Sequence, residues 1–266
     1  MPIAFTRSVP PSIVNCELTH LNREPINFAR AAEQHGLYER GLIALGCSIQ
    51  RLPSLSDLPD SVFVEDTAVV LPEIAIIARP GAASRRLEVT SVADALRPHR
   101  PLTFIEPPGT LDGGDVLAIG STIYVGESTR TNAEGVRQLA DLASAYGYAV
   151  RPVKVSGCLH LKSAVTRVAE DVILLNSAWV DSPSFKGMHQ IEVHPGEPFA
   201  ANALWIGENV IYPGSYDETR RRLEETGINV HLVETDELQK AEGGVTCCSI
   251  LISAHLGSGS EANCQE

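Results

Sequence analysis

Two adjacent cysteines, Cys247 and Cys248, follow the flexible pair Gly243-Gly244 and lie in the apolar segment 246–252. A thiol at the start of a buried strand, reached through a glycine turn, can act as a nucleophile that is rigid yet accessible to a substrate. Successive side chains of a strand point to opposite faces, so only one of the two thiols can face a given cavity. The pair therefore indicates covalent cysteine chemistry, which also requires a proton donor and a pocket.

Acidic residues gather in the segment 59–67, which contains Asp60, Glu65 and Asp66 around the apolar Phe63. Adjacent carboxylates beside an apolar run can bind a cation that carries several N–H donors, such as a guanidinium. Taken alone, the segment is more typical of acids that cap the solvated start of a strand.

A glycine-rich turn, 109–116, carries Asp112 and Asp115, and the segment 158–163 carries His160. Glycines let the backbone approach a ligand closely while an aspartate lies beside it. An imidazole is the commonest general acid or base, although a histidine between two leucines is also typical of a packed core. Both segments precede a predicted hairpin, so Asp112 and His160 are expected at equivalent positions in their repeat units.

Two arginines, Arg85 and Arg130, each lie between a predicted hairpin and a predicted helix. Their guanidinium groups could together clamp a carboxylate, because each presents a planar fork of N–H donors. Each is equally compatible with a solvated surface position.

The elements that must position these residues recur along the chain. Four pairs of short apolar runs, each joined by a polar turn, predict β-hairpins, and a helical pattern and a single strand follow them. Capping boxes at Thr131 with Glu134 and at Ser215 with Glu218 mark two of these helices. The predicted hairpins span 68–77, 116–125, 164–175 and 203–212, and the predicted single strands span 102–105, 149–155 and 228–233.

Residues 1–52 provide a fifth unit that lacks one hairpin strand, and the C-terminal strand 248–252 can supply it. Joining the first and last strands in one blade closes a ring, as in propellers. We therefore predict an α/β fold, a single domain over residues 1–254 built from five hairpin–helix–strand units. An ordinary α+β sandwich with coincidental repeats is the alternative. The small polar tail 255–266 is predicted to be disordered.

The composition excludes several classes of protein. No apolar run approaches 18 residues, and the N-terminus lacks the layout of a secretory signal. The six cysteines are therefore predicted to be reduced thiols in the cytoplasm. A net charge of −12 disfavours nucleic acids and anionic membranes as partners. Nucleotide-binding, serine-hydrolase and zincin motifs are absent from the sequence.

Taken together, these segments resemble the dimethylarginine dimethylaminohydrolases of the guanidine-modifying (pentein) superfamily. The resemblance extends from about residue 3 to residue 252, and it implies a five-bladed α/β propeller. The matching blocks, in order, are PDSVFVEDT (59–67), RPGAASRR (79–86), GTLDGGDV (109–116), GESTRTNAEG (126–135), CLHLKS (158–163) and GGVTCCSILI (243–252).

This resemblance implies that Cys247 is the nucleophile, His160 the general acid and base, and Asp112 the carboxylate that holds both substrate and histidine. Relatives carry either aspartate or glutamate at position 112, and some lack the second cysteine, so Cys248 is interpreted as a bystander. The implied substrate-binding residues are Glu65 and Asp66 for the guanidinium, Phe63 as an apolar wall, Arg85 and Arg130 for the carboxylate, Asp60 and the carbonyl of Leu18 for the α-amino group, and the main chain near Ala241 for the methylated nitrogen.

The implied reaction hydrolyses Nω-methylated arginines to citrulline and a methylated amine through a covalent thiouronium on the cysteine. It requires a small-molecule substrate and no cofactor or metal ion, and the resemblance is compatible with a homodimer. The alternatives are another guanidine hydrolase, such as an arginine or agmatine deiminase, and a non-catalytic propeller that binds a partner. A redox or metal-binding role for the vicinal cysteines is a further alternative.

Overall fold

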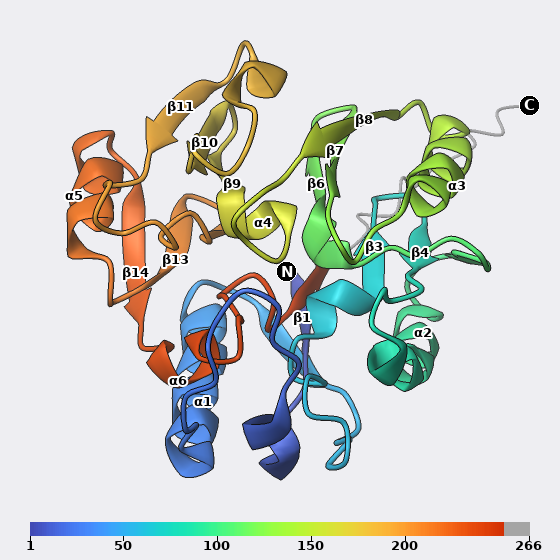
Figure 1. Cartoon of the computed structure of the whole chain (residues 1–266), viewed down its shortest axis with the longest axis horizontal. Helices are drawn as coiled ribbons and strands as arrows, with labels where there is room; N and C mark the ends of the chain where they lie inside the picture. Colours follow the sequence, from blue (N-terminus) through green and yellow to red (C-terminus); the bar gives the residue numbers. More distant parts are fainter. Residues whose placement is uncertain (253–266) are drawn as a thin grey trace, which may run out of the picture.

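Fifteen strands form five three-stranded sheets in the computed structural model, which describes residues 1–252. In each sheet the middle strand pairs antiparallel with one neighbour and parallel with the other. Figure 1 shows these sheets arranged as blades around a common centre. The blades, in chain order, are β15 (Ile250–Ile252), β1 (Ile3–Thr6) and β2 (Ser48–Arg51); β3 (Ala68–Val70), β4 (Ala75–Ile77) and β5 (Leu102–Phe104); β6 (Val116–Ile119), β7 (Thr122–Glu127) and β8 (Ala149–Lys154); β9 (Val165–Ala169), β10 (Val172–Leu175) and β11 (His189–Glu192); and β12 (Leu204–Ile206), β13 (Asn209–Pro213) and β14 (Asn229–Val233).

A crossover connection is needed between the two parallel strands of each blade, and in four blades a helix supplies it. These helices lie at the outside of the ring in Figure 1. They are α1 (Phe28–Ala44), α2 (Val89–Leu96), α3 (Ala133–Ser144) and α5 (Asp217–Glu225). The fourth blade has only the 3₁₀ turn η5 (Ser182–Phe185), so the predicted helix is wrong there. Pro183 and Gly187, the latter with φ of 99°, favour a turn over a helix in that short connection.

Apolar side chains fill the spaces between neighbouring blades. One cluster joins Ala4 of β1 to Ile211 of β13, and another joins Phe5 of β1 to Ile77 of β4. The first blade therefore packs against both the second and the fifth, which closes the ring. The repeat predicted from the sequence is confirmed.

Strand β15 completes the first blade by pairing antiparallel with β1, with Ile252 opposite Ile3 and Ile250 opposite Phe5. The strand is shorter than predicted, because Cys247 and Cys248 lie in the turn before it. Within that turn the N–H of Cys247 donates to the carbonyl of Gly244 at 3.2 Å. The alternation of a strand therefore does not decide which thiol faces the centre.

Both predicted capping boxes are wrong. Asn132 caps α3 by accepting from the N–H of Gly135 at 2.8 Å, and the Thr131 hydroxyl bonds elsewhere. Helix α5 begins without a cap from its own chain neighbours. The carboxylate of Glu197 accepts from its first-turn N–H groups, at 3.0 Å from Glu218 and 2.8 Å from Thr219.

Several candidate site residues lie in or directly before short helical turns: Glu65, Asp66 and Arg85 lie within them, and Phe63, Asp112 and His160 directly precede them. These turns are η1 (Pro11–Asn15), η2 (Val64–Thr67), η3 (Ala83–Glu88), η4 (Gly113–Asp115), α4 (Leu161–Ala164) and α6 (Asp236–Gln239). Among the described residues, no helix has the length and apolar character to cross a membrane. The predicted tail 255–266 and the last two residues of the predicted domain lie outside the described residues.

Candidate active site

A small pocket forms where the turns of several blades meet near the centre of the ring. Eight of the predicted site residues line it, although they lie far apart in the sequence. These are Asp60, Phe63, Asp66, Arg85, Arg130, His160, Ala241 and Cys247, and the other lining residues are Glu17, Leu159, Glu242 and Gly243.

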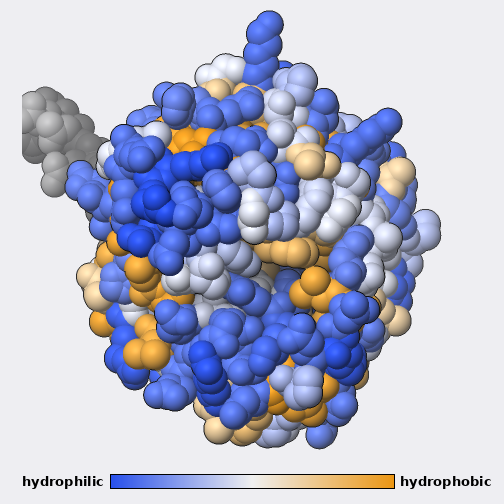
Figure 2. Space-filling view, turned by 60° about the vertical axis from the view of Figure 1, so that its left-hand side comes forward, coloured by the Kyte–Doolittle hydropathy of each residue, from blue (hydrophilic) through white to orange (hydrophobic). Residues whose placement is uncertain are grey.

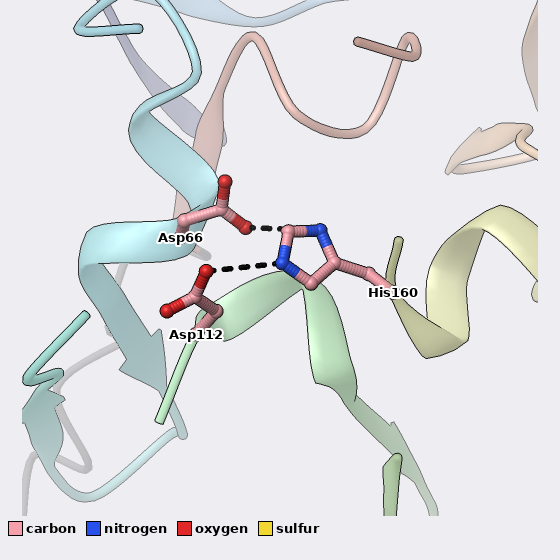
Figure 3. A group of neighbouring side chains, drawn as sticks. All are labelled: Asp66, Asp112 and His160. Atoms are coloured by element: carbon pink, nitrogen blue, oxygen red, sulfur yellow. Dashed lines mark hydrogen bonds and ion pairs between the residues drawn. The ribbon is translucent and has the colours of Figure 1, made fainter. Parts of the chain in front are cut away.

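His160 lies directly before α4 and is flanked by two carboxylates from other blades. Its Nε2 lies 3.0 Å from Oδ2 of Asp112, and its Nδ1 lies 3.7 Å from Oδ1 of Asp66. Figure 3 shows both carboxylates on the same side of the imidazole. All three side chains are buried, so their mutual electrostatic interaction is strong.

Three nearby carboxylates determine the charge of the imidazole. Burial disfavours the imidazolium, but the charges of Asp66, Asp112 and Asp115 outweigh this and raise the pKa of His160 to about 9. Burial likewise opposes the ionisation of Asp66, yet His160 and Arg85 lower its pKa to about 2. His160 is therefore a cation at neutral pH, with a proton available for transfer.

Asp66, Asp112 and His160 also form a group whose potential ligand atoms lie within 4.8 Å of one another, a spacing that could suit a metal ion. The oxygens of Asp66 already accept from the N–H of Gly114 at 3.0 Å and from Nη1 of Arg85 at 2.5 Å. A protonated His160 has no lone pair for a metal. We therefore interpret the group as a hydrogen-bonded acid–base cluster.

Cys247 is held in a turn where glycines allow close packing. A Cβ on Gly243 would lie 2.2 Å from the ring of Phe63, and one on Gly244 would lie 2.3 Å from the amide oxygen of Asn202. Burial, together with the negative charges of Glu65 and Asp66, raises the pKa of the Cys247 thiol to about 12. The thiol is therefore protonated before a ligand binds.

Cys248 is also buried, but it does not line the pocket. Its thiol donates to the carbonyl of Gly244 at 3.6 Å, and it packs in the same apolar cluster as Tyr38. The two cysteines thus differ in their access to the pocket.

Glu65 lies beside the cysteine turn and outside the pocket lining. Its carboxylate accepts from Nζ of Lys162 at 2.7 Å and from the hydroxyl of Thr246 at 2.6 Å. Its N–H donates to the carbonyl of Cys247 at 3.1 Å. Neither Lys162 nor Thr246 is predicted as a site residue from the sequence, although both belong to the matching blocks.

The two predicted carboxylate-binding arginines have different surroundings. Arg85 is buried, with ion pairs to Asp66 at 2.5 Å and Glu88 at 2.8 Å. Arg130 donates only weakly, to the hydroxyl of Thr19 at 3.3 Å, and lies 3.9 Å from Asp112. The donors of Arg130 are therefore the freer of the two sets.

The loop 17–24 lies beside the pocket, which Glu17 lines, and Glu242 binds the middle of this loop. The Glu242 carboxylate accepts from the N–H groups of His20 at 2.5 Å and of Leu21 at 2.7 Å. Glu242 has φ of 57°, which is unusual for a residue other than glycine. The half-buried Leu18 lies within this loop, and Asp60 accepts from the N–H of Glu17 at 3.1 Å. Nothing in the sequence marks Glu242 for this position.

A larger cavity, of about 340 Å³, adjoins the pocket and shares Leu159, Glu242 and Gly243 with it. Figure 2 shows that this side of the molecule is hollowed near its middle, with apolar surface at the edge of the hollow. Glu242, which binds the loop 17–24, therefore belongs to the wall between the pocket and the larger cavity.

Comparison with known proteins identifies the family. No protein-family model matches the sequence. A dimethylarginine dimethylaminohydrolase of Streptomyces coelicolor is 40% identical over 248 residues, covering 93% of this chain and 95% of that protein. One of Pseudomonas aeruginosa is 38% identical over 234 residues, covering 87% and 91%. The chain belongs to the dimethylarginine dimethylaminohydrolase family.

Solved structures of the family agree with this assignment. A cysteine-to-serine variant of the Pseudomonas aeruginosa dimethylarginine dimethylaminohydrolase, complexed with citrulline, superposes with a TM-score of 0.90 at 36% identity, covering 94% of this chain and 98% of that one. The N-terminal domain of ArgZ, a cyanobacterial arginine dihydrolase, reaches a TM-score of 0.87 at 15% identity over 95% and 98% of the chains, which shows the fold alone. The predicted five-bladed α/β propeller is confirmed.

Proposed function

We infer that this protein hydrolyses Nω-methylated arginines, such as asymmetric dimethylarginine and monomethylarginine, to citrulline and the methylated amine. Membership of the dimethylarginine dimethylaminohydrolase family and the likeness to a citrulline complex support this. The observation that carries the inference is that a buried thiol, Cys247, and a buried imidazole, His160, line one small pocket with the carboxylate of Asp66. A guanidinium carbon is a poor electrophile, so a thiolate is the suitable attacker.

Substrate binding provides the means to ionise the thiol. In the free protein, burial and nearby carboxylates raise the pKa of Cys247 to about 12. A bound guanidinium places a positive charge beside the sulfur, and this favours the thiolate. Asp66, which lines the pocket, attracts the same cation and helps to hold its carbon in place for attack, and Glu65 adds its negative charge from beside the cysteine turn.

His160 performs the proton transfers. The thiolate attacks the guanidinium carbon, and the proton on His160 passes to the methylated nitrogen as its bond to carbon breaks. The amine leaves and a thiouronium remains on Cys247. Neutral His160 then takes a proton from water, and the hydroxide adds to carbon. The carbon–sulfur bond breaks as the hydroxyl proton passes to the sulfur, which gives citrulline and restores the Cys247 thiol. Asp112 orients the imidazole at 3.0 Å throughout.

The remaining pocket residues recognise the amino acid end of the substrate. Arg130, with its freer donors, is the principal ligand for the α-carboxylate, and Arg85 contributes from a fixed position. Asp60 and the carbonyl of Leu18 receive the α-amino group, Phe63 packs against the side chain, and the main chain at Ala241 contacts the methylated nitrogen. This arrangement disfavours agmatine, which has no carboxylate.

The cellular setting is also part of the proposal. We expect a cytoplasmic protein, because all five described cysteines are free thiols, as is usual in a reducing compartment. A homodimer stays a prediction of the family resemblance. Size-exclusion chromatography with light scattering measures the oligomeric state.

The decisive experiment compares citrulline release from asymmetric dimethylarginine, arginine and agmatine by the native protein and by Cys247→Ser. Dimethylarginine is expected to be hydrolysed fastest, and the variant is expected to be inactive. Faster turnover of arginine or agmatine would assign the protein to the deiminases. Equal activity of the native and Cys247→Ser proteins would exclude the covalent mechanism.

A further inference from the structure

We propose that Asp115 is a positioning residue that fixes three segments of the active site relative to one another. This proposal rests on the reaction inferred above. The Asp115 carboxylate lies outside the pocket lining. Asp115 is completely buried in the third blade, three residues after Asp112. Its two oxygens accept three hydrogen bonds, and each leads to a different segment of the site.

The first bond reaches the residue that follows the catalytic histidine. Oδ1 of Asp115 accepts from the N–H of Leu161 at 3.0 Å. Leu161 is the first residue of α4, so this bond fixes the main chain next to His160. A Cβ on Gly126 would lie 2.7 Å from the same oxygen, so the neighbouring strand is shaped to admit the carboxylate.

The second bond reaches the proposed ligand of the substrate carboxylate. Oδ2 of Asp115 accepts from the hydroxyl of Ser128 at 2.5 Å. That hydroxyl in turn accepts from the N–H of Arg130 at 3.0 Å. Ser128 thereby relays the position of Asp115 to the main chain of Arg130.

The third bond links Asp115, through Thr131, to Asp112, the hydrogen-bond partner of His160. Oδ2 of Asp115 also accepts from the hydroxyl of Thr131 at 2.7 Å. The same hydroxyl accepts from the N–H of Asp112 at 3.2 Å. Thr131 therefore links the arginine loop to the catalytic aspartate through the same carboxylate.

A buried carboxylate can hold three segments because each hydrogen bond to an ionised acceptor is short and strong. Its charge has a second effect, since it is one of the groups that stabilise the imidazolium of His160. Burial raises the pKa of Asp115 itself to about 6, so the carboxylate is ionised near neutral pH. Asp115 thus acts on the active site in two ways: its hydrogen bonds fix the main chain, and its negative charge stabilises the imidazolium of His160.

The first test separates the segments. Ser128→Ala disconnects Arg130 while the bonds of Asp115 to Thr131 and Leu161 remain. We expect KM for asymmetric dimethylarginine to rise about tenfold with kcat nearly unchanged. A substrate analogue without the α-carboxylate, dimethylagmatine, should show the same KM with both proteins. Thr131→Val, which disconnects Asp112, is expected to lower kcat instead.

The second test measures the charge without relying on activity. In Asp115→Asn, NMR titration of the His160 ring should show a pKa at least 0.5 units lower than in the native protein. Glu39→Gln is the matched control, because Glu39 is a buried carboxylate that accepts from Thr6 at 2.7 Å and pairs with Arg51 away from the pocket. This control is expected to leave both the His160 pKa and the kinetics unchanged.

These results distinguish the proposal from its alternatives. A purely structural role predicts lower thermal stability with unchanged KM, kcat and His160 pKa in the folded fraction, and that result overturns the proposal. If Asp115→Asn does not fold, the opposite KM and kcat effects of the Ser128 and Thr131 variants decide alone. Absence of citrulline release by the native protein would reject the proposed function, and the NMR titration would still report on Asp115.

Discussion

The carboxylate of Glu242 accepts from the main-chain N–H of Leu21 at 2.7 Å, and both residues line the larger cavity beside the pocket. The same carboxylate also accepts from Thr19 and His20, so a single side chain holds three consecutive residues of the loop 17–24. Glu242 lines both the pocket and the adjoining cavity. Within the loop, residues 19–21 are therefore anchored mainly by this carboxylate.

Removing this contact should loosen the loop. In Glu242→Ala we expect the amides of residues 19–21 to exchange with deuterium at least tenfold faster, because each hydrogen bond to a charged group contributes about 1.5–3 kcal/mol. Mass-spectrometric exchange measures this directly. Glu242→Gly is the matched control, since it also relieves the unfavourable φ of 57°. Unchanged exchange in both variants would contradict the assigned contact.

The two cysteines should respond differently to substitution. Cys247→Ser is expected to lower kcat at least a thousandfold, whereas Cys248→Ala should retain activity within about threefold, because its thiol points to the carbonyl of Gly244 and not into the pocket. Labelling of Cys247 by iodoacetamide at pH 7 should be slow, because burial raises the pKa of its thiol to about 12. Rapid labelling of the free protein would indicate a thiolate already present before substrate binds.

Arg85 and Arg130 should separate stability from substrate binding. Arg85→Ala leaves the buried carboxylates of Asp66 and Glu88 without their partner, and breaking such a pair costs about 3–5 kcal/mol of unfolding free energy. Arg130→Ala should change stability by less than about 1 kcal/mol while raising KM at least tenfold. Urea unfolding and steady-state kinetics measure the two effects. Equal destabilisation by both substitutions would contradict the distinction.

Acid stability should depend on His35. This residue is buried on α1, its Nε2 has no hydrogen-bond partner among the described residues, and burial lowers its pKa to about 4. The unfolded state, with a pKa near 6.5, binds more protons between pH 4 and 6.5. The stabilisation is therefore complete above about pH 6.5 and is lost as the pH falls towards 4, by about 3 kcal/mol in total.

Urea unfolding at pH 7 and at pH 4.5 checks this expectation, with His35→Leu as the comparison. The variant should lose less unfolding free energy than the native protein over that interval. A loss of the same size in both proteins would mean that other groups control acid stability.

Much of the fold follows from local sequence. The hairpins at 68–77 and 203–212 are apolar runs around short turns, and their pairing needs no distant information. Helix N-termini are harder to predict from local sequence. Glu197, for example, caps α5 from another segment of the chain. No local pattern specifies such a contact.

The candidate site shows the same division. Eight of the residues that line the pocket could be predicted because their blocks match a known family. The sequence alone does not predict that Asp66 pairs with Arg85, or that Glu242 binds the loop 17–24. Those relationships depend on how five blades approach one another, and they required the three-dimensional arrangement.

The pairing of β15 with β1 also bears on synthesis. Residues 3–5 cannot pair with their antiparallel partners until residues 250–252 have left the ribosome. A nascent chain can form blades two to five earlier, but the ring stays open and the first blade lacks a strand. Contacts of such large sequence separation form slowly. Because Cys247 lies in the turn before β15, the nucleophile reaches its position only with the closing step, so partly made chains carry no assembled active site.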